Sequence, residues 1–324
     1  MVKNTLVLGN KINEIPVGGV TVSVWTATDP APGMPPGHHD SLNVEVGEGW
    51  VCVGGGGTSH GGYTGTSSSD PDYWFRGFGN FLTASFPSDD FGSWNLSSRD
   101  HINEDQSQLD GYAIGMKIRD SAGDLTKDEL ISNMQLFKSE DTVAKKHTAH
   151  SCSIGDGFLL LGGGFQVLDQ FRGNLGTASF PDSTISWQAC SKDHQIDSVS
   201  RMKVFAIGIR PTLFRANSTV FGNVVTTYNS SERSYSLDSP NGDYTVSDYV
   251  NTAVHPLPGF ALCGGGAVCH INPAKGRYLW ALEPTTKPDA IESDQEFSGR
   301  STILTSFDDW GPITVYAMGI KRVT

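Results

Sequence analysis

Residues 49–56 read GWVCVGGG, an apolar run that ends in three consecutive glycines. Residues 157–164 repeat the pattern as GFLLLGGG, and residues 259–266 repeat it again as GFALCGGG. Recurrence of one pattern at a regular interval is the sequence signature of an internally repeated architecture. We therefore expect the chain to consist of three diverged copies of one unit.

Three further patterns accompany the glycine run in the same order. The second pattern follows the glycines, at residues 79–87 (GNFLTASFP), 173–181 (GNLGTASFP) and, more weakly, 276–284 (GRYLWALEP). The third closes each unit, at residues 112–116 (YAIGM), 205–209 (FAIGI) and 316–320 (YAMGI). The fourth opens each unit, at residues 4–10 (NTLVLGN), 217–223 (NSTVFGN) and, faintly, 133–137 (NMQLF). The predicted units are residues 1–125, 126–215 and 216–324.

The composition indicates an all-β fold. The 324 residues include 38 glycines and 16 prolines, which suit short strands joined by turns. One segment is ambiguous, because Thr126 and Glu129 form a capping box and apolar residues follow at helical spacing. The corresponding segments of the other copies are strand-like, so we expect a strand in the core of residues 126–138. A short helical turn near Thr126 stays open.

The glycine runs predict how the units pack. The residues before each triplet are almost all apolar, as in strands that are covered on both faces. Glycine inside a strand allows a bulge or a close backbone approach. Neither a P-loop nor a dinucleotide-binding fingerprint fits, because no Gly-Lys-Ser/Thr and no helical pattern follow the glycines. Three related sheets around a pseudo-threefold axis would bury these strands and leave few exposed edges.

A resemblance follows from the combined motifs. The order of Gly-Trp/Phe, Gly-Gly-Gly, Thr-Ala-Ser-Phe-Pro, Ser-Lys/Arg-Asp-His and Ala-Ile-Gly-Ile gives a threefold plan that resembles the β-prism of vitelline membrane outer layer protein I. It is also similar to the prism domains of perforin-like toxins. The resemblance covers most of the chain at the level of architecture and implies a β-prism. It implies no site residues. The units are longer than the usual prism third, so a three-lobed β assembly is the alternative.

Charge and hydropathy exclude several partners. The net charge is −12, from 23 Lys and Arg against 35 Asp and Glu, whereas nucleic-acid binding needs a basic surface. An anionic membrane is disfavoured for the same reason. No apolar run reaches membrane-spanning length, and the stretch at residues 1–8 (MVKNTLVL) is too short for a secretory signal. We expect a soluble chain, either secreted or cytoplasmic, with its oligomeric state open.

The cysteines and the histidine-rich segment favour no metal or cofactor. None of the five cysteines has CxxC spacing, and we expect buried, inert thiols. Residues 38–40 (HHD) offer three ligand types in a row, but adjacent residues rarely converge on one ion. Residues 238–244 (DSPNGDY) resemble a hairpin tip with Asn-Gly rather than a calcium loop.

A tryptophan-aspartate-histidine motif occurs in the first two copies. Residues 94–101 read WNLSSRDH and residues 187–194 read WQACSKDH, whereas residues 293–297 (SDQEF) lack both Trp and His. An aromatic face, a carboxylate and an imidazole suit sugar binding, or acid–base chemistry. The structural alternative is an aspartate that accepts turn amides above a packed indole. The candidate residues are Trp94, Asp100, His101, Trp187, Asp193 and His194.

The first copy also contains an insertion. Between Gly57 and Gly77 the chain runs through a Gly- and Ser-rich segment that ends in Asp72-Tyr73-Trp74, whereas the second copy passes from Gly164 to Phe171 in a few residues. Long loops on rigid scaffolds often carry function. Asp72, Tyr73 and Trp74 are therefore candidate ligand-binding residues, or else the anchors of a surface loop.

These observations lead to three hypotheses about function. We favour a lectin-like, carbohydrate-binding or surface-recognition protein without catalysis, whose ligand is a glycan or small molecule. The first alternative is an enzyme that uses Asp100, His101, Asp193 and His194 as acid–base groups in a cleft between repeats. The second is a structural or toxin-accessory module. The orientation of Trp94 and Trp187 is the most informative test, because a ligand can stack only on exposed rings.

Overall fold

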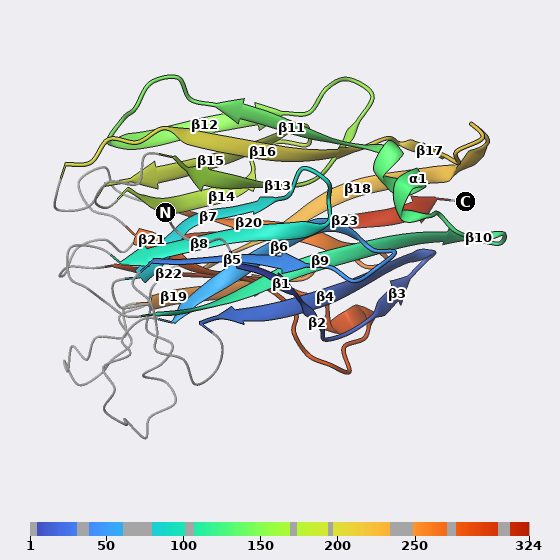
Figure 1. The fold of residues 1–324 in the computed structure, drawn as a ribbon, viewed down its shortest axis with the longest axis horizontal. Coiled ribbons are helices and arrows are strands. Elements are labelled where there is room, and N and C mark those ends of the chain that lie inside the picture. The colour runs from blue at the N-terminus through green and yellow to red at the C-terminus, as the bar shows by residue number, and fades with distance from the viewer. Residues whose placement is uncertain are drawn as a thin grey trace.

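The chain folds into β-sheets, as its composition predicts. The computed structural model describes residues 5–30, 39–60, 80–100, 107–168, 174–193, 197–233, 249–270, 277–303 and 312–323. Three sheets account for most of this part of the chain, with one short helix, α1 (Lys127–Ser132), and one 3-10 turn, η2 (Glu292–Asp294) (Figure 1). Within the described ranges, no helix has the length and apolar character needed to cross a membrane.

Each sheet has a defined strand order. The first sheet runs β1 (Thr5–Leu8), β5 (His39–Glu45), β8 (Ser93–Asp100), β7 (Asn80–Pro87), β13 (Leu159–Val167), β16 (Met202–Ile209) and β11 (Met134–Glu140). The second runs β19 (Tyr249–Val254), β22 (Phe297–Ile303), β21 (Arg277–Pro284), β6 (Val51–His60), β9 (Gln108–Asp120), β4 (Val20–Asp29) and β2 (Asn10–Lys11), with β10 (Gly123–Asp124) on β9 and β3 (Ile15–Val17) on β4. The third runs β12 (His147–Ser153), β15 (Ser186–Lys192), β14 (Leu175–Pro181), β20 (Ala261–Cys269), β23 (Ile313–Val323), β18 (Val220–Arg233) and β17 (Thr212–Phe214).

Every sheet contains one seam at which two sets of strands from distant parts of the sequence meet. In the first sheet β7 pairs with β13, in the third β14 pairs with β20, and in the second β21 pairs with β6. All three seams are antiparallel and short, with one or two paired positions each. We call them the β7–β13, β14–β20 and β21–β6 seams.

The glycine runs lie in β6, β13 and β20, beside these seams. A register shift interrupts the pairing at the start of each run, between Cys52 and Gly54, between Leu160 and Gly162, and between Leu262 and Gly264. The prediction that the glycines allow bulges is therefore confirmed in all three runs.

The middle glycine of each run makes room for one aromatic ring. A Cβ atom would lie 2.4 Å from Trp94 Cγ at Gly55, 2.4 Å from Trp187 Cγ at Gly163, and 2.3 Å from Phe297 Cγ at Gly265. Such distances are far below van der Waals contact, so a side chain at any of these positions would displace a buried ring.

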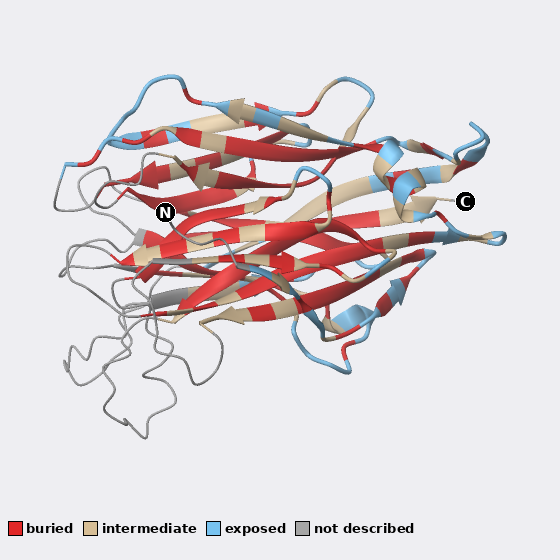
Figure 2. Cartoon of the chain, viewed as in Figure 1, coloured by how far each residue is buried: buried red, intermediate tan, exposed pale blue. Residues whose placement is uncertain are grey.

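The first and last glycines approach neighbouring main chain instead. At the last glycines, a Cβ atom would lie 2.0 Å from the Leu282 carbonyl oxygen at Gly56 and 2.0 Å from the Ser179 carbonyl oxygen at Gly266. At Gly264 it would lie 3.9 Å from the Cα atoms of both Gly54 and Gly162. The three runs therefore meet in the interior, where the strands are buried along most of their length (Figure 2).

A second, smaller apolar cluster lies apart from the main core. It contains Phe81 of β7, Leu175 of β14, and Tyr278, Trp280 and Ala281 of β21, all fully buried. Phe81 and Tyr278 contact each other with ring centroids 5.3 Å apart. Burial of each large side chain stabilises the fold by roughly 1.5–3 kcal/mol. The cluster therefore holds together three strands that belong to three different sheets.

The ambiguous segment contains both a helix and a strand. Thr126 and Glu129 form the reciprocal capping box, and helix α1 follows before Asn133 ends it. Strand β11 then begins at Met134 and pairs with β16. The predicted strand is therefore present from Met134 onward, and the helical turn left open near Thr126 is helix α1, which takes up residues 127–132.

The fourth sequence pattern is not structurally equivalent in the first copy. Leu6, Val7 and Leu8 lie in β1, which pairs in parallel with β5. Val220 and Phe221 lie at the start of β18, which pairs antiparallel with β23. The strand of the first copy that corresponds to β18 is β4, which pairs antiparallel with β9 as β18 does with β23, and β4 begins only at Val20. The match of residues 4–10 to residues 217–223 is therefore wrong as a structural equivalence.

Candidate functional site

The two motif tryptophans belong to the core. Trp94 is 2% exposed and Trp187 is fully buried. The indole nitrogen of Trp94 donates to Ser85 Oγ at 2.9 Å, and that of Trp187 donates to Ser179 Oγ at the same distance. Each ring packs over its glycine run and offers no face to a ligand. The prediction that these two residues bind a ligand by stacking is therefore wrong.

Asp193 has the structural role that the sequence offered as the alternative. One carboxylate oxygen accepts the Ser198 amide at 3.2 Å, and the other lies 3.1 Å from His147 Nε2. The Asp193 carbonyl oxygen accepts the Tyr278 hydroxyl at 3.0 Å. These contacts hold the chain as it leaves β15. Asp193 is buried and committed to its neighbours, which weakens the acid–base hypothesis.

The other predicted site residues divide into two groups. Asp100 is buried at the end of β8, where it pairs with Asn80 of β7. The remaining candidates, Asp72, Tyr73, Trp74, His101 and His194, lie outside the described residues. The described part of the chain therefore does not bring the candidate residues together into one site.

One of the positions at which the three seams differ locates a candidate site. Phe86 of β7 stacks on Phe205 of β16 with centroids 4.6 Å apart, and Phe180 of β14 stacks on Tyr316 of β23 at 5.5 Å. At the β21–β6 seam the residue before the strand-ending proline is Glu283 instead of phenylalanine. Its Oε1 accepts the hydroxyl of Tyr112 at 3.1 Å. A polar contact thus replaces an aromatic stack.

Glu283 is the centre of a half-buried polar network. Arg300 NH2 of β22 lies 2.9 Å from Glu283 Oε2, and the Ser298 hydroxyl lies 3.4 Å from the same oxygen. The Arg300 guanidinium also lies over the Trp280 ring, 5.4 Å from its centroid. Burial, reinforced by the charges of Glu283 and Asp110, raises the pKa of Tyr112 well above its usual value. Tyr112 therefore stays protonated and donates to Glu283.

The network opens into a depression of about 400 Å³ on the surface of the third unit. We call it the β21–β22 depression. Its lining is polar, and one side consists of the segment around η2. It is lined by His255, Glu283, Pro284, Thr285, Thr286, Lys287, Ser293, Asp294, Glu296, Ser298 and Arg300.

The groups in this depression offer both donors and acceptors. His255 Nδ1 lies 2.7 Å from the Gln295 carbonyl oxygen, which can only accept, so Nδ1 carries the proton. In the neutral ring Nε2 is then an acceptor. The Ile291 amide, assisted by Lys287, holds the pKa of Asp294 below its usual range. Among the described residues, no three metal-ligating side chains come together here or elsewhere.

The sequence contains a signal for this site. The second pattern reads Ser-Phe-Pro in two copies and Leu-Glu-Pro in the third, so the replacement of phenylalanine by Glu283 is visible in the alignment. Arg300 and Tyr112 could not be chosen in the same way. Arg300 lies on the next strand, and Tyr112 comes from the far side of the seam, at the other end of the chain.

Two smaller polar clusters occupy similar strand ends. His60 Nε2 lies 2.8 Å from Asp110 Oδ2, and Thr28 donates to Asp110 Oδ1 at 2.6 Å. In the third sheet His270 Nε2 lies 2.8 Å from Thr314 Oγ1, which lies 3.1 Å from Glu232 Oε2. In the first cluster the carboxylate is Asp110, on β9 between β6 and β4. In the second it is Glu232, on β18 at the outer side of β23. Each cluster satisfies its own groups, so neither is our preferred site.

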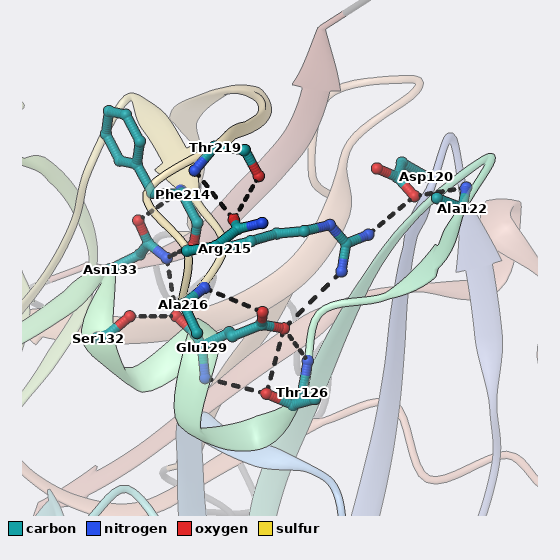
Figure 3. Close-up of polar contacts among 11 residues, drawn as sticks. Asp120, Ala122, Thr126, Glu129, Ser132, Asn133, Phe214, Arg215, Ala216 and Thr219 are labelled. Atoms are coloured by element: carbon teal, nitrogen blue, oxygen red, sulfur yellow. Dashed lines mark hydrogen bonds and ion pairs between the residues drawn. The ribbon is translucent and has the colours of Figure 1, made fainter.

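A further polar cluster joins strand β9, helix α1 and the loop after β17 (Figure 3). Arg215 lies between two carboxylates, with NH2 3.1 Å from Asp120 Oδ1 and NH1 3.8 Å from Glu129 Oε2. The amides of Thr126 and Ala216 donate to Glu129 and hold its pKa below the usual range. These contacts join helix α1 to the loop after β17 and to Asp120.

The cysteines agree with the prediction of buried thiols. All five are free, four are buried and Cys190 is half-buried. Burial raises the pKa of Cys152 and of Cys190 to about 11, and that of Cys52 and Cys263 further still. Thiolate, the nucleophilic form, is therefore scarce at neutral pH.

Comparison with known proteins gives no family for this chain. No protein-family model matches it, and no curated protein matches it.

Proposed function

We propose that the three units are arranged as a closed ring around a pseudo-threefold axis. Each unit places at least three strands in each of two sheets, so that the β7–β13, β14–β20 and β21–β6 seams join unit one to two, two to three and three to one. Three observations support this arrangement: the bulges at matching glycines, the close approach of Gly54, Gly162 and Gly264, and the cluster of Phe81, Leu175 and Tyr278.

On this scaffold we propose a non-catalytic recognition protein that binds a glycan in the β21–β22 depression. One observation carries the proposal: two seams are closed by stacked aromatic rings, and the third has the Tyr112–Glu283–Arg300 network beside a polar depression. A polar network that replaces an aromatic stack next to an open depression is a suitable place for a specific site.

The chemistry of the lining favours a ligand rich in hydroxyl groups. A sugar hydroxyl both donates and accepts, and the depression supplies carboxylates as acceptors, Arg300 and Lys287 as donors, and threonine and serine hydroxyls as both. Glu283 and Arg300 hold each other in place, so these groups are positioned before a ligand arrives. A phosphate-rich ligand is disfavoured because Arg300 is already paired and the chain is acidic.

A glycan screen tests the proposal. We would apply the protein to a panel of immobilised glycans and measure each hit by isothermal titration calorimetry. Glu296→Ala and Thr286→Ala change groups that line the depression, and each is expected to weaken binding at least tenfold, about 1.4 kcal/mol. The matched control is Phe86→Leu, which alters the corresponding position of the β7–β13 seam and should leave affinity unchanged.

Two results would contradict the proposal. One is the absence of any hit at millimolar sugar. The other is a hit whose affinity is the same for the wild type, Glu296→Ala and Thr286→Ala, since the ligand would then bind elsewhere. Thermal unfolding of every variant separates a lost site from a lost fold.

A further inference from the structure

Among the described residues, strand β18 has main-chain partners on only one side over most of its length. Its register with β23 is uninterrupted from Asn223 to Arg233. On its other side β17 pairs only as far as Asn223, and the Val224 amide donates to the Pro211 carbonyl oxygen at 2.9 Å. Beyond Val224, none of the described residues makes a main-chain hydrogen bond to this side of the strand.

The direction of the Val224 amide fixes which residues face outward. In an antiparallel strand the amide and carbonyl groups of alternate residues point to the same side. The groups that point away from β23 therefore belong to Thr226, Tyr228, Ser230 and Glu232. The Ser230 amide agrees, because it donates to the side-chain Oδ1 of Asn229, 3.0 Å away, and not to β23.

The chain covers a similar edge elsewhere. Strand β4 lies beside β9 as β18 lies beside β23, and β2 and β3 pair along its outer side. Val24 occupies the position on β4 that Tyr228 occupies on β18. Its amide donates to Asn13 Oδ1 at 3.0 Å, and its carbonyl accepts the Ile12 amide at 2.8 Å. An added extended segment therefore satisfies this edge when the chain supplies one.

The β18 edge also lacks the features that usually keep edges apart. Charged side chains, prolines and bulges discourage edge pairing, but residues 225–231 read VTTYNSS and contain none of them. Val, Thr and Tyr also have high strand propensity. The outer strand beside β16 differs, because β11 carries Lys138, paired with Asp89, and Glu140, paired with Arg201.

We propose that β18 pairs antiparallel with β18 of a second copy of this chain, so that two sheets become one across a twofold axis. A strand that pairs with itself in this direction is self-complementary and closes at two copies. The free edge begins after Val224 and ends with the strand at Arg233, and pairing centred on Asn229 uses all of it.

This register places Thr226 opposite Glu232 of the partner subunit and Tyr228 opposite the partner's Ser230. The twofold axis repeats both pairs, and two hydrogen bonds per pair give about eight between the copies. Two of these require the Ser230 amide to exchange the Asn229 side chain for the carbonyl of the partner's Tyr228. No like charges face each other, because Arg233 lies opposite Val225 of the partner subunit. Residues 225–231 at the centre of the contact carry no charge, and Glu232 and Arg233 lie at its ends.

Sedimentation velocity of the full chain from 1 to 100 µM tests the proposal, and a dimer is expected. Thr226→Pro and Ser230→Pro each remove an outward amide without touching the ladder to β23, because proline is tolerated at such edge positions. Each should raise the dimer dissociation constant at least tenfold. Thr226→Val keeps the amide and is the matched control, with an unchanged dissociation constant.

Hydrogen exchange provides a readout that does not depend on the variants. The amides of Thr226, Tyr228 and Glu232 should exchange more slowly as the protein concentration rises. The amides of Thr227, Asn229 and Ser231 donate to β23 and should be protected at every concentration. A wild type that stays monomeric at 100 µM overturns the proposal. A dimer whose dissociation constant is the same in the wild type and in both proline variants overturns the proposal as well.

Discussion

Replacing Gly163 with alanine tests whether the middle glycine of each run exists to admit a ring. The new Cβ atom would lie 2.4 Å from Trp187 Cγ and 2.5 Å from the Phe205 carbonyl oxygen. The indole is fully buried, and the carbonyl belongs to the β13–β16 pairing, so neither can withdraw freely. In an unhindered strand the same change would stabilise the fold by about 0.5–1 kcal/mol, because alanine loses less backbone entropy.

The steric effect should outweigh the entropic one. An overlap of about 1 Å with two rigid groups belongs at the upper end of the 1–3 kcal/mol range for overpacked cores. We therefore expect Gly163→Ala to lower the free energy of unfolding by about 2–3 kcal/mol, measured by urea denaturation. Because the clash is with the ring, Gly163→Ala should cost much less in a Trp187→Ala background than in the wild type, since the added Cβ then has no Cγ atom to meet.

Gly157→Ala is the matched control. Gly157 has a positive φ of 80° and no atom within 4 Å of an added Cβ, so its cost comes from the backbone alone, about 1 kcal/mol. If Gly163→Ala costs no more than Gly157→Ala, or if its cost is the same with and without the Trp187 ring, the reasoning about ring and glycine is refuted.

Three other predictions concern the polar groups and thiols. Asp193→Ala should lower the free energy of unfolding by about 2 kcal/mol, because the Ser198 and His147 contacts are lost. Asp193→Asn should lower it less. A change in glycan affinity without a change in stability would contradict this structural role. At pH 8 a thiol reagent should label the folded protein slowly and should reach five equivalents only in denaturant. The reason is that the thiols are buried, and burial raises the pKa of Cys152 and Cys190. Rapid labelling of the folded chain would contradict this expectation. The pKa values of Asp90, bonded to Ser88 and the Gly92 amide, and of Asp124, beside Arg119, are lowered by folding, so their stabilisation is complete above about pH 5 and is lost as the pH falls through and below about 4. Urea midpoints measured from pH 3 to 7 should follow this course, and a midpoint that rises on acidification would contradict it.

The parts of the fold that the sequence predicted depend on local chemistry. Apolar residues followed by glycines predicted the buried, bulged strands β6, β13 and β20, because only glycine tolerates such close contacts. The capping box at Thr126 also predicted a real helix, and the preference for a strand there came from the comparison with other copies. The match of residues 4–10 to residues 217–223 failed because short apolar stretches look alike in parallel and antiparallel strands.

The parts that could not be predicted depend on contacts between distant strands. The equivalence of Phe297 to the two motif tryptophans appears only when its ring is seen against Gly265, since residues 293–297 otherwise match neither motif. The orientation of Trp94 and Trp187 was equally undetermined, because an alternating strand pattern does not say which face is covered. Glu283 stands out in the sequence, but its partner Tyr112 becomes visible only in the folded chain.

The β21–β6 seam has a consequence for the order of folding. The β7–β13 and β14–β20 seams join strands that are moderately close in sequence, whereas Thr58 and Ala281 bring together opposite ends of the chain. Contacts of such long range form late, because much of the chain must be ordered before they can stabilise it. The polar network of Glu283 is therefore expected to assemble in the last step of folding, and it would be the first part to open when the native state fluctuates.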